Sequence, residues 1–354
     1  MRERVTGEGA HGLIIYVCKQ EVMATGMKII FMGTPDFAVS ALEALCRAGK
    51  DVILAVTQPD RQKGRGRKVI ETPVKICAEK WGIPVYQPVR IREAEPIEKI
   101  RSLAPDLIVV AAFGQILPRE LLDIPRLGCV NIHASLLPRL RGAAPIQWAV
   151  INGDKESGIT LMQMNEGLDT GDILFQESVP IGPEETGESL YGKLAKLGGE
   201  MIVRHLPAIE AGQISPVQQD DEKSSYAPML RKEMGEIDWS QPAEQIARTL
   251  RGMLPWPGAY TYLDGHVLKV WRAEVGEMTD PALSGMLSGQ DVLPGVVLGN
   301  DKKALYVRTA DGVLALLEVQ LQGKKRMTAD AFLRGTRIPA GTMLGNRGFG
   351  ETGN

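Results

Sequence analysis

Two hydrophobic periods alternate along residues 27–212. Short apolar runs predict strands, and the stretches between them, whose apolar residues recur at i, i+3 and i+4, predict helices. The predicted strands are 28–33, 51–58, 84–88, 106–113, 129–133 and 158–164, and the predicted helices include 36–49, 95–104 and a long one over about 185–212. Alternating strands and helices favour an α/β domain built on a parallel sheet, with right-handed crossovers and helices on both faces.

The pattern changes after a polar segment at residues 213–228, which is rich in turn-forming residues and is predicted to be a linker. Beyond it, one amphipathic helix is predicted over 241–253. Short strands follow, separated by hairpin signals at 263–266, 299–301 and 309–313. Regularly spaced short strands predict a second, small domain over 229–345, an OB-like β-barrel.

The two ends of the chain, residues 1–26 and 346–354, are expected to lie outside both domains. The longest apolar piece of the first segment, 12–17, is shorter than the core of a secretory signal, and acidic residues argue against a transit peptide. A strand pattern begins directly after Met27. We therefore expect residues 1–26 to be a disordered extension or the product of a misassigned upstream start, and 346–354 to be a tail.

The overall composition is that of a soluble protein with a substantial core: 354 residues, 44% hydrophobic and 24% charged. This length suffices for two domains, and no apolar run approaches the ~20 residues of a membrane helix. The net charge of −2 gives no general attraction to nucleic acid, so a site for a polyanion would be a local patch. The four cysteines are isolated in the sequence and form no CxxC pair: Cys18, Cys46, Cys77 and Cys129. This argues against a zinc site or a disulfide framework and favours a reducing cytoplasm. We expect a cytoplasmic monomer that binds neither a metal nor a membrane.

Candidate chemistry begins in the predicted strand 129–133, "CVNIH". Side chains alternate along a strand, so Val130 and Ile132 share one face while Asn131 and His133 share the other. A strand within a parallel sheet is buried on both faces, so two polar side chains there need a reason. A lone histidine is commonly a core residue that bonds a backbone carbonyl. Ligands, however, bind at the carboxyl ends of parallel strands, and both polar residues stand at such an end.

A carboxylate follows the last predicted strand of this domain: Asp169 lies between Gly167 and Gly171, in a loop that can approach a ligand closely. The alternative role for such an aspartate is local turn capping. With Asn131 and His133, expected at the end of a neighbouring strand, it would supply an amide donor, a proton carrier and an orienting carboxylate. This set suits acyl transfer. The sequence has no GxSxG motif for a serine nucleophile and no pattern of metal ligands.

Two stretches around these residues carry a family resemblance. "NIHASLLPRLRGAAPIQWA" and "MNEGLDTGDIL" resemble the signature of the folate-dependent formyltransferases, including the spacing of 36 residues between His133 and Asp169. The branch of that family that formylates tRNA is resembled by "FMGTPDFAV", "TQPDRQKGRGRK", "AAFGQILP", "KEMGEIDWSQPAEQI", "LPWPGAYTYLDG" and "GKKRM". The resemblance covers about 27–345. It implies a Rossmann-like formyltransferase domain followed by the OB-like domain.

The resemblance also implies a reaction. The formyl group of 10-formyltetrahydrofolate would pass to the α-amino group of methionine on initiator tRNA, without a covalent enzyme intermediate and without a metal. Asn131 would hydrogen-bond the formyl oxygen and stabilise its negative charge. His133 would assist that charge and manage protons. Asp169 would hold a water and the imidazole in place, and its charge would favour the protonated ring.

The folate pocket implied by the resemblance lies on two loops that could present apolar walls and backbone groups to a pterin. Ordinary surface turns are the alternative interpretation of both. The implied residues are Phe113, Gly114, Gln115, Ile116 and Leu117 in the first loop, Ser135, Leu136, Leu137 and Pro138 in the second, and Met164 and Glu166 at the border.

The segment 61–68, "RQKGRGRK", has five basic and no acidic residues among eight. It follows the carboxyl end of a strand, the same edge as the candidate site, so it could reach a polyanion whose end enters that site. Its two glycines suit a flexible loop that orders on binding. The resemblance implies that it recognises the acceptor end of initiator tRNA through Arg61, Lys63, Arg65, Arg67 and Lys68.

The second domain would add non-specific contacts to the tRNA backbone through Lys324, Lys325 and Arg326. A solvated basic surface is the alternative for this cluster and for the segment 61–68. The motif "LPWPGA" is predicted to be structural: its two prolines fix a turn while Trp256 packs.

Three other functions are alternatives for this sequence. A dinucleotide-dependent dehydrogenase is disfavoured because "GTPDFA" after the first strand is not GxGxxG. A formyltransferase acting on a small amine, glycinamide ribonucleotide or an amino-sugar nucleotide, would share Asn131, His133 and Asp169. The basic segment and the second domain favour tRNA over these acceptors. Retention of the three residues argues against a catalytically idle RNA-binding protein.

Overall fold

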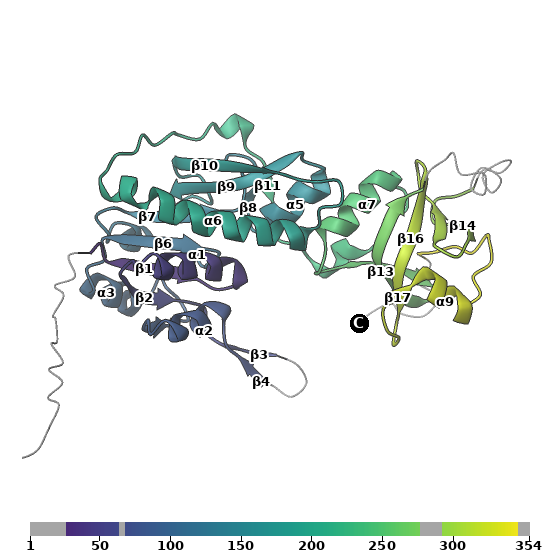
Figure 1. Cartoon of the computed structure of the whole chain (residues 1–354), viewed down its shortest axis with the longest axis horizontal. Coiled ribbons are helices and arrows are strands. Elements are labelled where there is room, and N and C mark those ends of the chain that lie inside the picture. Colours follow the sequence, from purple (N-terminus) through teal and green to yellow (C-terminus); the bar gives the residue numbers. More distant parts are fainter. Residues whose placement is uncertain (1–25, 64–67, 277–291, 346–354) are drawn as a thin grey trace, which may run out of the picture.

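The computed structural model describes residues 26–63, 68–276 and 292–345. The predicted N-terminal extension, apart from Gly26, lies outside the described residues, as do the predicted tail and the candidate tRNA contacts Arg65 and Arg67. Two domains follow one another along the chain (Figure 1).

The first domain is built on a seven-stranded sheet in the order β10-β9-β7-β6-β1-β2-β5. All six predicted strands are present. Strands β5, β2, β1, β6 and β7 run parallel, as expected, whereas β9 runs antiparallel to both of its neighbours, β7 and β10. Hydrophobic alternation carries no strand direction, so the sequence pattern did not separate β9 from the parallel strands. The bounds are β1 Ile29–Gly33, β2 Val52–Val56, β5 Val85–Tyr86, β6 Leu107–Ala111, β7 Cys129–His133, β9 Glu156–Gln163 and β10 Ile173–Pro180.

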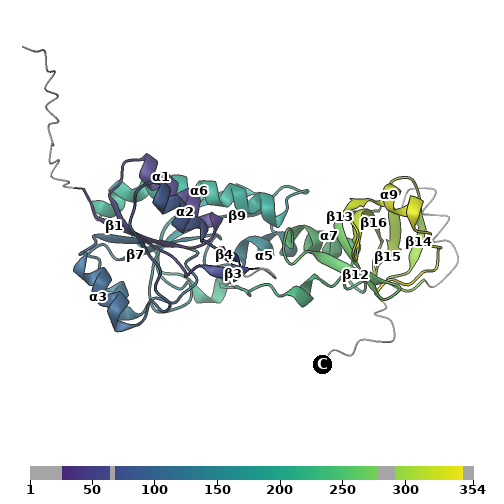
Figure 2. The same cartoon turned by 90° about the horizontal axis from the view of Figure 1, so that it is seen from below.

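Helices cover both faces of this sheet (Figure 2). Alternate residues of β1 show how: Ile29 and Phe31 join the core cluster that contains residues of α1 and α6, while Ile30 and Met32 join the cluster that contains residues of α3 and α4. The strand is therefore apolar at every position. The helices are α1 Asp36–Arg47, α2 Pro73–Lys80, α3 Ala94–Ser102, α4 Arg119–Leu122, α5 Pro145–Asn152 and α6 Gly187–Glu210.

The described flanks of the basic segment form a two-stranded hairpin ladder that stands apart from the main sheet (Figure 1). Strand β3, Arg61–Lys63, pairs with β4, Lys68–Ile70, in an antiparallel ladder. The backbone groups of these flanks pair with each other, and the two glycines of the predicted flexible loop lie outside the described residues.

The predicted linker lies against the first domain. Within it, β11 (Tyr226–Ala227) pairs in parallel with β8 (Arg141–Gly142), and η1 (Asp221–Lys223) precedes β11. Val217 also bridges Ile173 at the start of β10. The segment 213–228 does connect the two domains, but its polar groups bond to the first domain instead of to solvent alone.

The second domain is an antiparallel sheet in the order β12-β13-β16-β15-β14, with β17 on β16. It curves around one core that includes Trp239, Leu268 and Leu316, consistent with the predicted OB-like domain. At its junction with the first domain, α5 and α7 share a small cluster that includes Ile151 and Met253. The elements are η2 Lys232–Gly235, α7 Ala243–Gly252, β12 Ala259–Leu263, β13 His266–Val275, β14 Val297–Asn300, β15 Leu305–Arg308, β16 Val313–Leu321, β17 Met327–Thr328 and α9 Ala329–Gly335.

The prediction that Trp256 packs was wrong, because its side chain is 57% exposed between α7 and β12. The buried tryptophan is Trp239, which is 6% exposed and donates a hydrogen bond from Nε1 to Thr261 Oγ1 at 3.1 Å. The core position is thus filled by a residue outside the "LPWPGA" motif.

Candidate active site

Strand β7 presents its polar and apolar residues as the alternation predicts. Val130 and Ile132 enter the cluster beneath α1 and α6, and Cys129 enters the cluster on the opposite face. Asn131 and His133 share that opposite face by parity. The Asn131 side chain is partly buried, and its amide has no hydrogen-bond partner within the described residues. An amide held in this way is free to donate to a bound group.

The His133 imidazole is buried and is held at both ring nitrogens. Nε2 lies 3.1 Å from the backbone carbonyl oxygen of Leu140, and Nδ1 lies 3.5 Å from Asp169 Oδ1. A carbonyl oxygen only accepts, so Nε2 carries a proton in this contact. Both nitrogens thus face acceptors, and a doubly protonated ring satisfies both.

Asp169 reaches His133 through the loop at residues 164–172. We expected it at the end of a neighbouring parallel strand, but β9 is antiparallel, with Gln163 opposite Val130 and Thr160 opposite His133. The strand therefore ends away from His133, and the loop must return along the strand. Its carboxylate is fixed on the other side by the backbone N–H of Gly142, which donates to Oδ2 at 2.8 Å.

The first predicted folate loop is tied to two neighbouring strand ends. The Phe113 carbonyl accepts hydrogen bonds from Thr34 Oγ1 at 3.0 Å and Gln58 Nε2 at 3.2 Å. Gln115 Oε1 accepts from the backbone N–H of Ile91 at 2.8 Å. Ile116, by contrast, is 79% exposed. The loop therefore has a fixed backbone and an apolar side chain at its surface.

The other predicted folate residues divide into two groups. Phe113, Leu117 and Met164 meet in the cluster on the Asn131 face of the sheet. Four more, Ser135, Leu136, Leu137 and Pro138, lie in the loop after β7. Ser135 and Leu137 are buried, and Leu136 packs against Gly158 of β9, so this loop is largely structural. Gly114 turns the first loop with a φ of +82°, and Glu166 is exposed on the loop 164–172.

The predicted tRNA contacts lie on two separate surfaces. Arg61 is exposed on β3, and the backbones of Lys63 and Lys68 pair across the hairpin. In the second domain Lys324 and Lys325 are exposed beyond β16. The neighbouring Arg326 is exposed too, but it donates to Glu318 and lies 4.9 Å from the Trp271 ring centre. Its charge is therefore already paired.

The sequence interpretation missed the residues that hydrogen-bond His133 and Asp169 and hold them in place. They include Gly142, Leu140 and the buried Gln219, whose contacts depend on backbone groups or on the predicted linker. The motif "RLRGAAP" contained the first two, but nothing in its pattern indicated which backbone atoms face inward.

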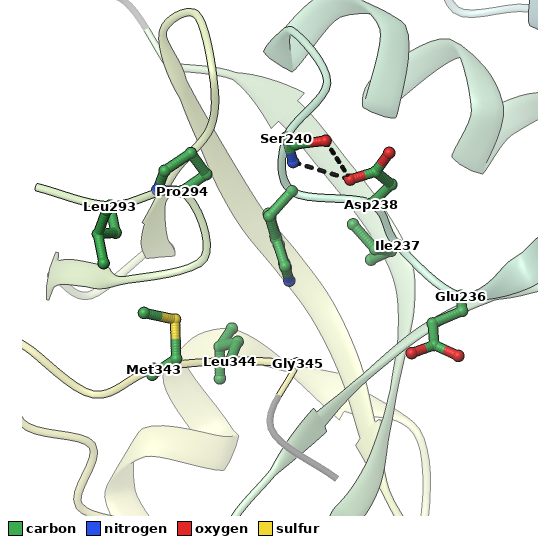
Figure 3. Close-up of a pocket in the computed structure, with 10 residues that line it drawn as sticks. Glu236, Ile237, Asp238, Ser240, Leu293, Pro294, Met343, Leu344 and Gly345 are labelled. Atoms are coloured by element: carbon green, nitrogen blue, oxygen red, sulfur yellow. Dashed lines mark hydrogen bonds between the residues drawn. The ribbon is translucent and has the colours of Figure 1, made fainter.

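An open pocket with a volume of about 760 Å³ lies in the second domain, lined in part by Ile237, Leu293 and Leu344 (Figure 3). Asp238 accepts hydrogen bonds from the Ser240 backbone and hydroxyl, which lower the pKa of its carboxyl together with a bond from Gln241. These polar atoms serve a local turn. The pocket contains none of the candidate catalytic residues.

Within residues 26–63, 68–276 and 292–345, no group of three or more His, Cys, Asp or Glu side chains could hold a metal ion. None of the helices there has the length and apolar character needed to cross a membrane.

The structural comparisons reproduce the fold. A sugar 3N-formyltransferase, WlaRD, superposes with a TM-score of 0.60 at 19% identity, covering 84% of this chain and 99% of WlaRD. HypX from Aquifex aeolicus in complex with tetrahydrofolic acid gives 0.56 at 19% identity over 87% of this chain. The present chain spans about half of HypX, 47% of its length.

Sequence comparisons are more specific. Residues 27–206 match the formyl transferase family, and 229–337 match the formyl transferase C-terminal domain. A methionyl-tRNA formyltransferase from Geotalea uraniireducens is 50% identical over 322 residues, 91% of this chain and 99% of the relative. Another from Geobacter metallireducens is 51% identical over 321 residues, 91% of this chain and 99% of the relative. The chain belongs to the formyl transferase family, among the methionyl-tRNA formyltransferases.

Proposed function

We propose that this protein transfers the formyl group of 10-formyltetrahydrofolate to the α-amino group of methionine on initiator tRNA, with Asn131, His133 and Asp169 as the catalytic residues. The observation that carries this proposal is the Asn131 amide, which has no hydrogen-bond partner among the described residues, beside the His133–Asp169 pair in a chain about half identical to methionyl-tRNA formyltransferases. The reaction serves the initiation of translation.

The residues around Asn131 suit a folate co-substrate. The buried Phe113 and Leu117 and the partly buried Met164 form an apolar cluster on the face that carries Asn131. Next to it, the exposed Ile116 lies on a loop whose backbone is fixed by Thr34, Gln58 and Gln115. A flat pterin ring needs this combination of apolar contact and positioned backbone groups.

Asn131 and His133 stabilise the charge that develops during transfer. As the amine nitrogen bonds to the formyl carbon, the formyl oxygen gains negative charge, and the Asn131 amide donates a hydrogen bond to it. The protonated His133 ring, anchored by the Leu140 carbonyl, adds positive charge nearby. Removing one such donor typically costs about 2.7–4 kcal/mol of transition-state stabilisation.

The His133–Asp169 pair handles the proton that changes place. The attacking amine loses one proton, the bond between the formyl carbon and N10 breaks, and N10 gains one proton, so the overall reaction is balanced without a covalent enzyme intermediate. The protonated imidazole, 3.5 Å from the Asp169 carboxylate, can give a proton to N10 and regain one from the amine.

Recognition of tRNA is assigned to the two basic surfaces. Arg61, Lys63 and Lys68 belong to the β3–β4 ladder, which follows β2 at the carboxyl edge of the sheet, and Arg65 and Arg67 lie between them in the sequence. Lys324 and Lys325 of the second domain would contact phosphates farther along the tRNA. The whole chain has a net charge of −2, so these local patches must provide the attraction.

A three-acceptor assay tests this function. Formyl transfer from 10-formyltetrahydrofolate is measured with Met-charged initiator tRNA, Met-charged elongator tRNA and glycinamide ribonucleotide. We expect strong preference for the initiator tRNA. Transfer to the small amine alone would retain the catalytic residues and overturn the assignment of the hairpin and the second domain.

A further inference from the structure

The segment 213–228, here called the strap, lies directly beside the catalytic carboxylate. Its residue Gln219 is only 7% exposed and donates from Nε2 to the backbone carbonyl of Asp169 at 2.9 Å and to that of Gly171 at 2.6 Å. Its Oε1 accepts from Nε and Nη2 of Arg141 at 3.0 and 2.8 Å. Every polar atom of this buried amide is therefore used.

The backbone of Asp169 needs such support. Its φ is +53°, a left-handed conformation that is uncommon for a residue other than glycine and costs about 1–3 kcal/mol. A conformation of this kind persists only where surrounding contacts hold it. Gln219 bonds the carbonyl of that same residue, and so contributes to the direction in which the carboxylate points toward His133.

The strap makes a second contact with the site. Ser225 Oγ accepts a hydrogen bond from the backbone N–H of Leu140 at 2.9 Å. The Leu140 carbonyl in turn accepts from His133 Nε2, and Leu140 also has a positive φ, +57°. Gln219 of the strap thus bonds the backbone of Asp169, and Ser225, nearer its other end, bonds the backbone of Leu140, whose carbonyl orients the imidazole.

The strap packs so closely against Gly142 that no side chain fits at this position. A Cβ added there would lie 2.6 Å from the Tyr226 ring and 2.8 Å from the Ala227 carbonyl oxygen. The N–H of Gly142 is the group that donates to Asp169 Oδ2. Arg141 joins the same contact, donating to Asp221 Oδ1 at 2.7 Å as well as to Gln219. Displacing the strap would therefore disturb both supports of the carboxylate.

We propose that Gln219 and Ser225 are positioning residues for the formyl transfer: Gln219 sets the geometry of Asp169, and Ser225 sets that of His133 through Leu140. The inference rests on the proposed function, because it assigns these residues to that same site. It makes the strap part of the catalytic apparatus and not simply a connection between domains.

The test uses the full chain with Gln219→Ala, Ser225→Ala and Ser225→Thr, and with Gln218→Ala as the matched control. Gln218 is the adjacent glutamine of the strap, is exposed, and has no hydrogen bond among the described side chains. We expect Gln219→Ala and Ser225→Ala to lower kcat by about 10- to 100-fold, the loss typical of a misplaced reacting group. KM for both substrates should stay close to normal, Ser225→Thr should recover most of the activity, and Gln218→Ala should match the unchanged chain.

The pH dependence of kcat separates positioning from instability. A smaller folded fraction scales the whole profile, whereas an altered Asp169–His133 contact shifts its midpoint, so we expect a shifted midpoint in both alanine variants. Normal kcat in both variants, or a loss that follows the folded fraction with an unshifted midpoint, overturns the inference. If Gln219→Ala does not fold, the comparison of Ser225→Ala with Ser225→Thr decides.

The outcome is distinguishable from failure of the proposed function. The unchanged chain is first assayed with the three acceptors, and the strap variants are then assayed with whichever amine it formylates. An unchanged chain that ignores methionyl-tRNA overturns the proposed acceptor and leaves the strap test in place. An active unchanged chain with fully active strap variants overturns the strap inference only.

Discussion

Asp169 Oδ1 lies 3.5 Å from Nδ1 of His133, although β9, which leads into the loop that carries Asp169, runs antiparallel to β7, which ends at His133. The contact places a carboxylate on one side of the buried imidazole and the Leu140 carbonyl on the other. An asparagine at position 169 would keep the shape of the side chain but remove its negative charge.

Asp169→Asn is therefore expected to lower kcat by at least about 100-fold, the lower end of what proton-transfer groups contribute. Binding of folate and tRNA should remain mostly intact, because the variant keeps the shape of the side chain. Steady-state kinetics and equilibrium binding measure the two effects. Asp172→Asn, an exposed residue of the same loop, is the control. Turnover near normal in the Asp169 variant contradicts the catalytic assignment.

Asn131→Ala is expected to lower kcat by about 10²- to 10³-fold, the effect of removing one donor to a developing oxyanion. The thermal stability should change little, because the amide has no hydrogen-bond partner in the described part of the chain. Kinetics and a thermal melt test both parts. A rise in KM with unchanged kcat would show that Asn131 contributes only to binding.

Replacing Arg65 and Arg67 with Ala should weaken the use of tRNA and flatten its salt dependence. Each lost phosphate contact should reduce the slope of log(kcat/KM) against log[KCl] by about 1, so the double variant should lose about 2. The control is Arg47→Ala with Arg101→Ala, two exposed arginines at the ends of α1 and α3. An unchanged slope in the hairpin variant argues against the hairpin as a phosphate-binding arm.

Lys75 joins the two ends of the basic hairpin. Its Nζ lies 2.7 Å from Asp60 Oδ2, just before β3, and 2.8 Å from Glu71 Oε1, just after β4. The hydrogen bond from Lys75 lowers the pKa of the Asp60 carboxyl, and a second bond from Gln87 adds to this. Because the folded-state pKa is lowered, the contribution of Asp60 to stability is present above its unfolded pKa, about 3.9, and is lost as pH falls through the folded value.

Lys75→Met is accordingly expected to reduce hydrogen-exchange protection of the β3–β4 amides at pH 7. The difference from the unchanged chain should begin to shrink as the pH falls below about 4, the unfolded pKa of an aspartate, and should vanish below the lowered pKa of the folded Asp60 carboxyl. Protection factors, which correct for the intrinsic pH dependence of exchange, provide the measurement. Lys80→Met at the exposed end of α2 is the control. Equal protection at pH 7 would show that the ion pairs do not stabilise the hairpin.

Local pattern alone was sufficient for much of the first domain. The continuous apolar run of β1 and the alternation in β7 predicted strands, because a side chain's face depends only on its place in the strand. The same parity put Asn131 and His133 on one face, and "GLDTGDIL" marked Asp169 as the third residue. These features depend on near neighbours in the chain.

Contacts between distant segments were decided by the tertiary structure. The direction of β9 depends on which neighbour it pairs with, and the burial of Trp239 in place of Trp256 depends on which side chain fills the second core. Gln219 looks like any polar linker residue until the fold brings it within 2.9 Å of the Asp169 carbonyl, 50 residues away in the sequence. A hydrogen bond to a backbone group leaves no periodic signal, because its partner is an atom that every residue carries.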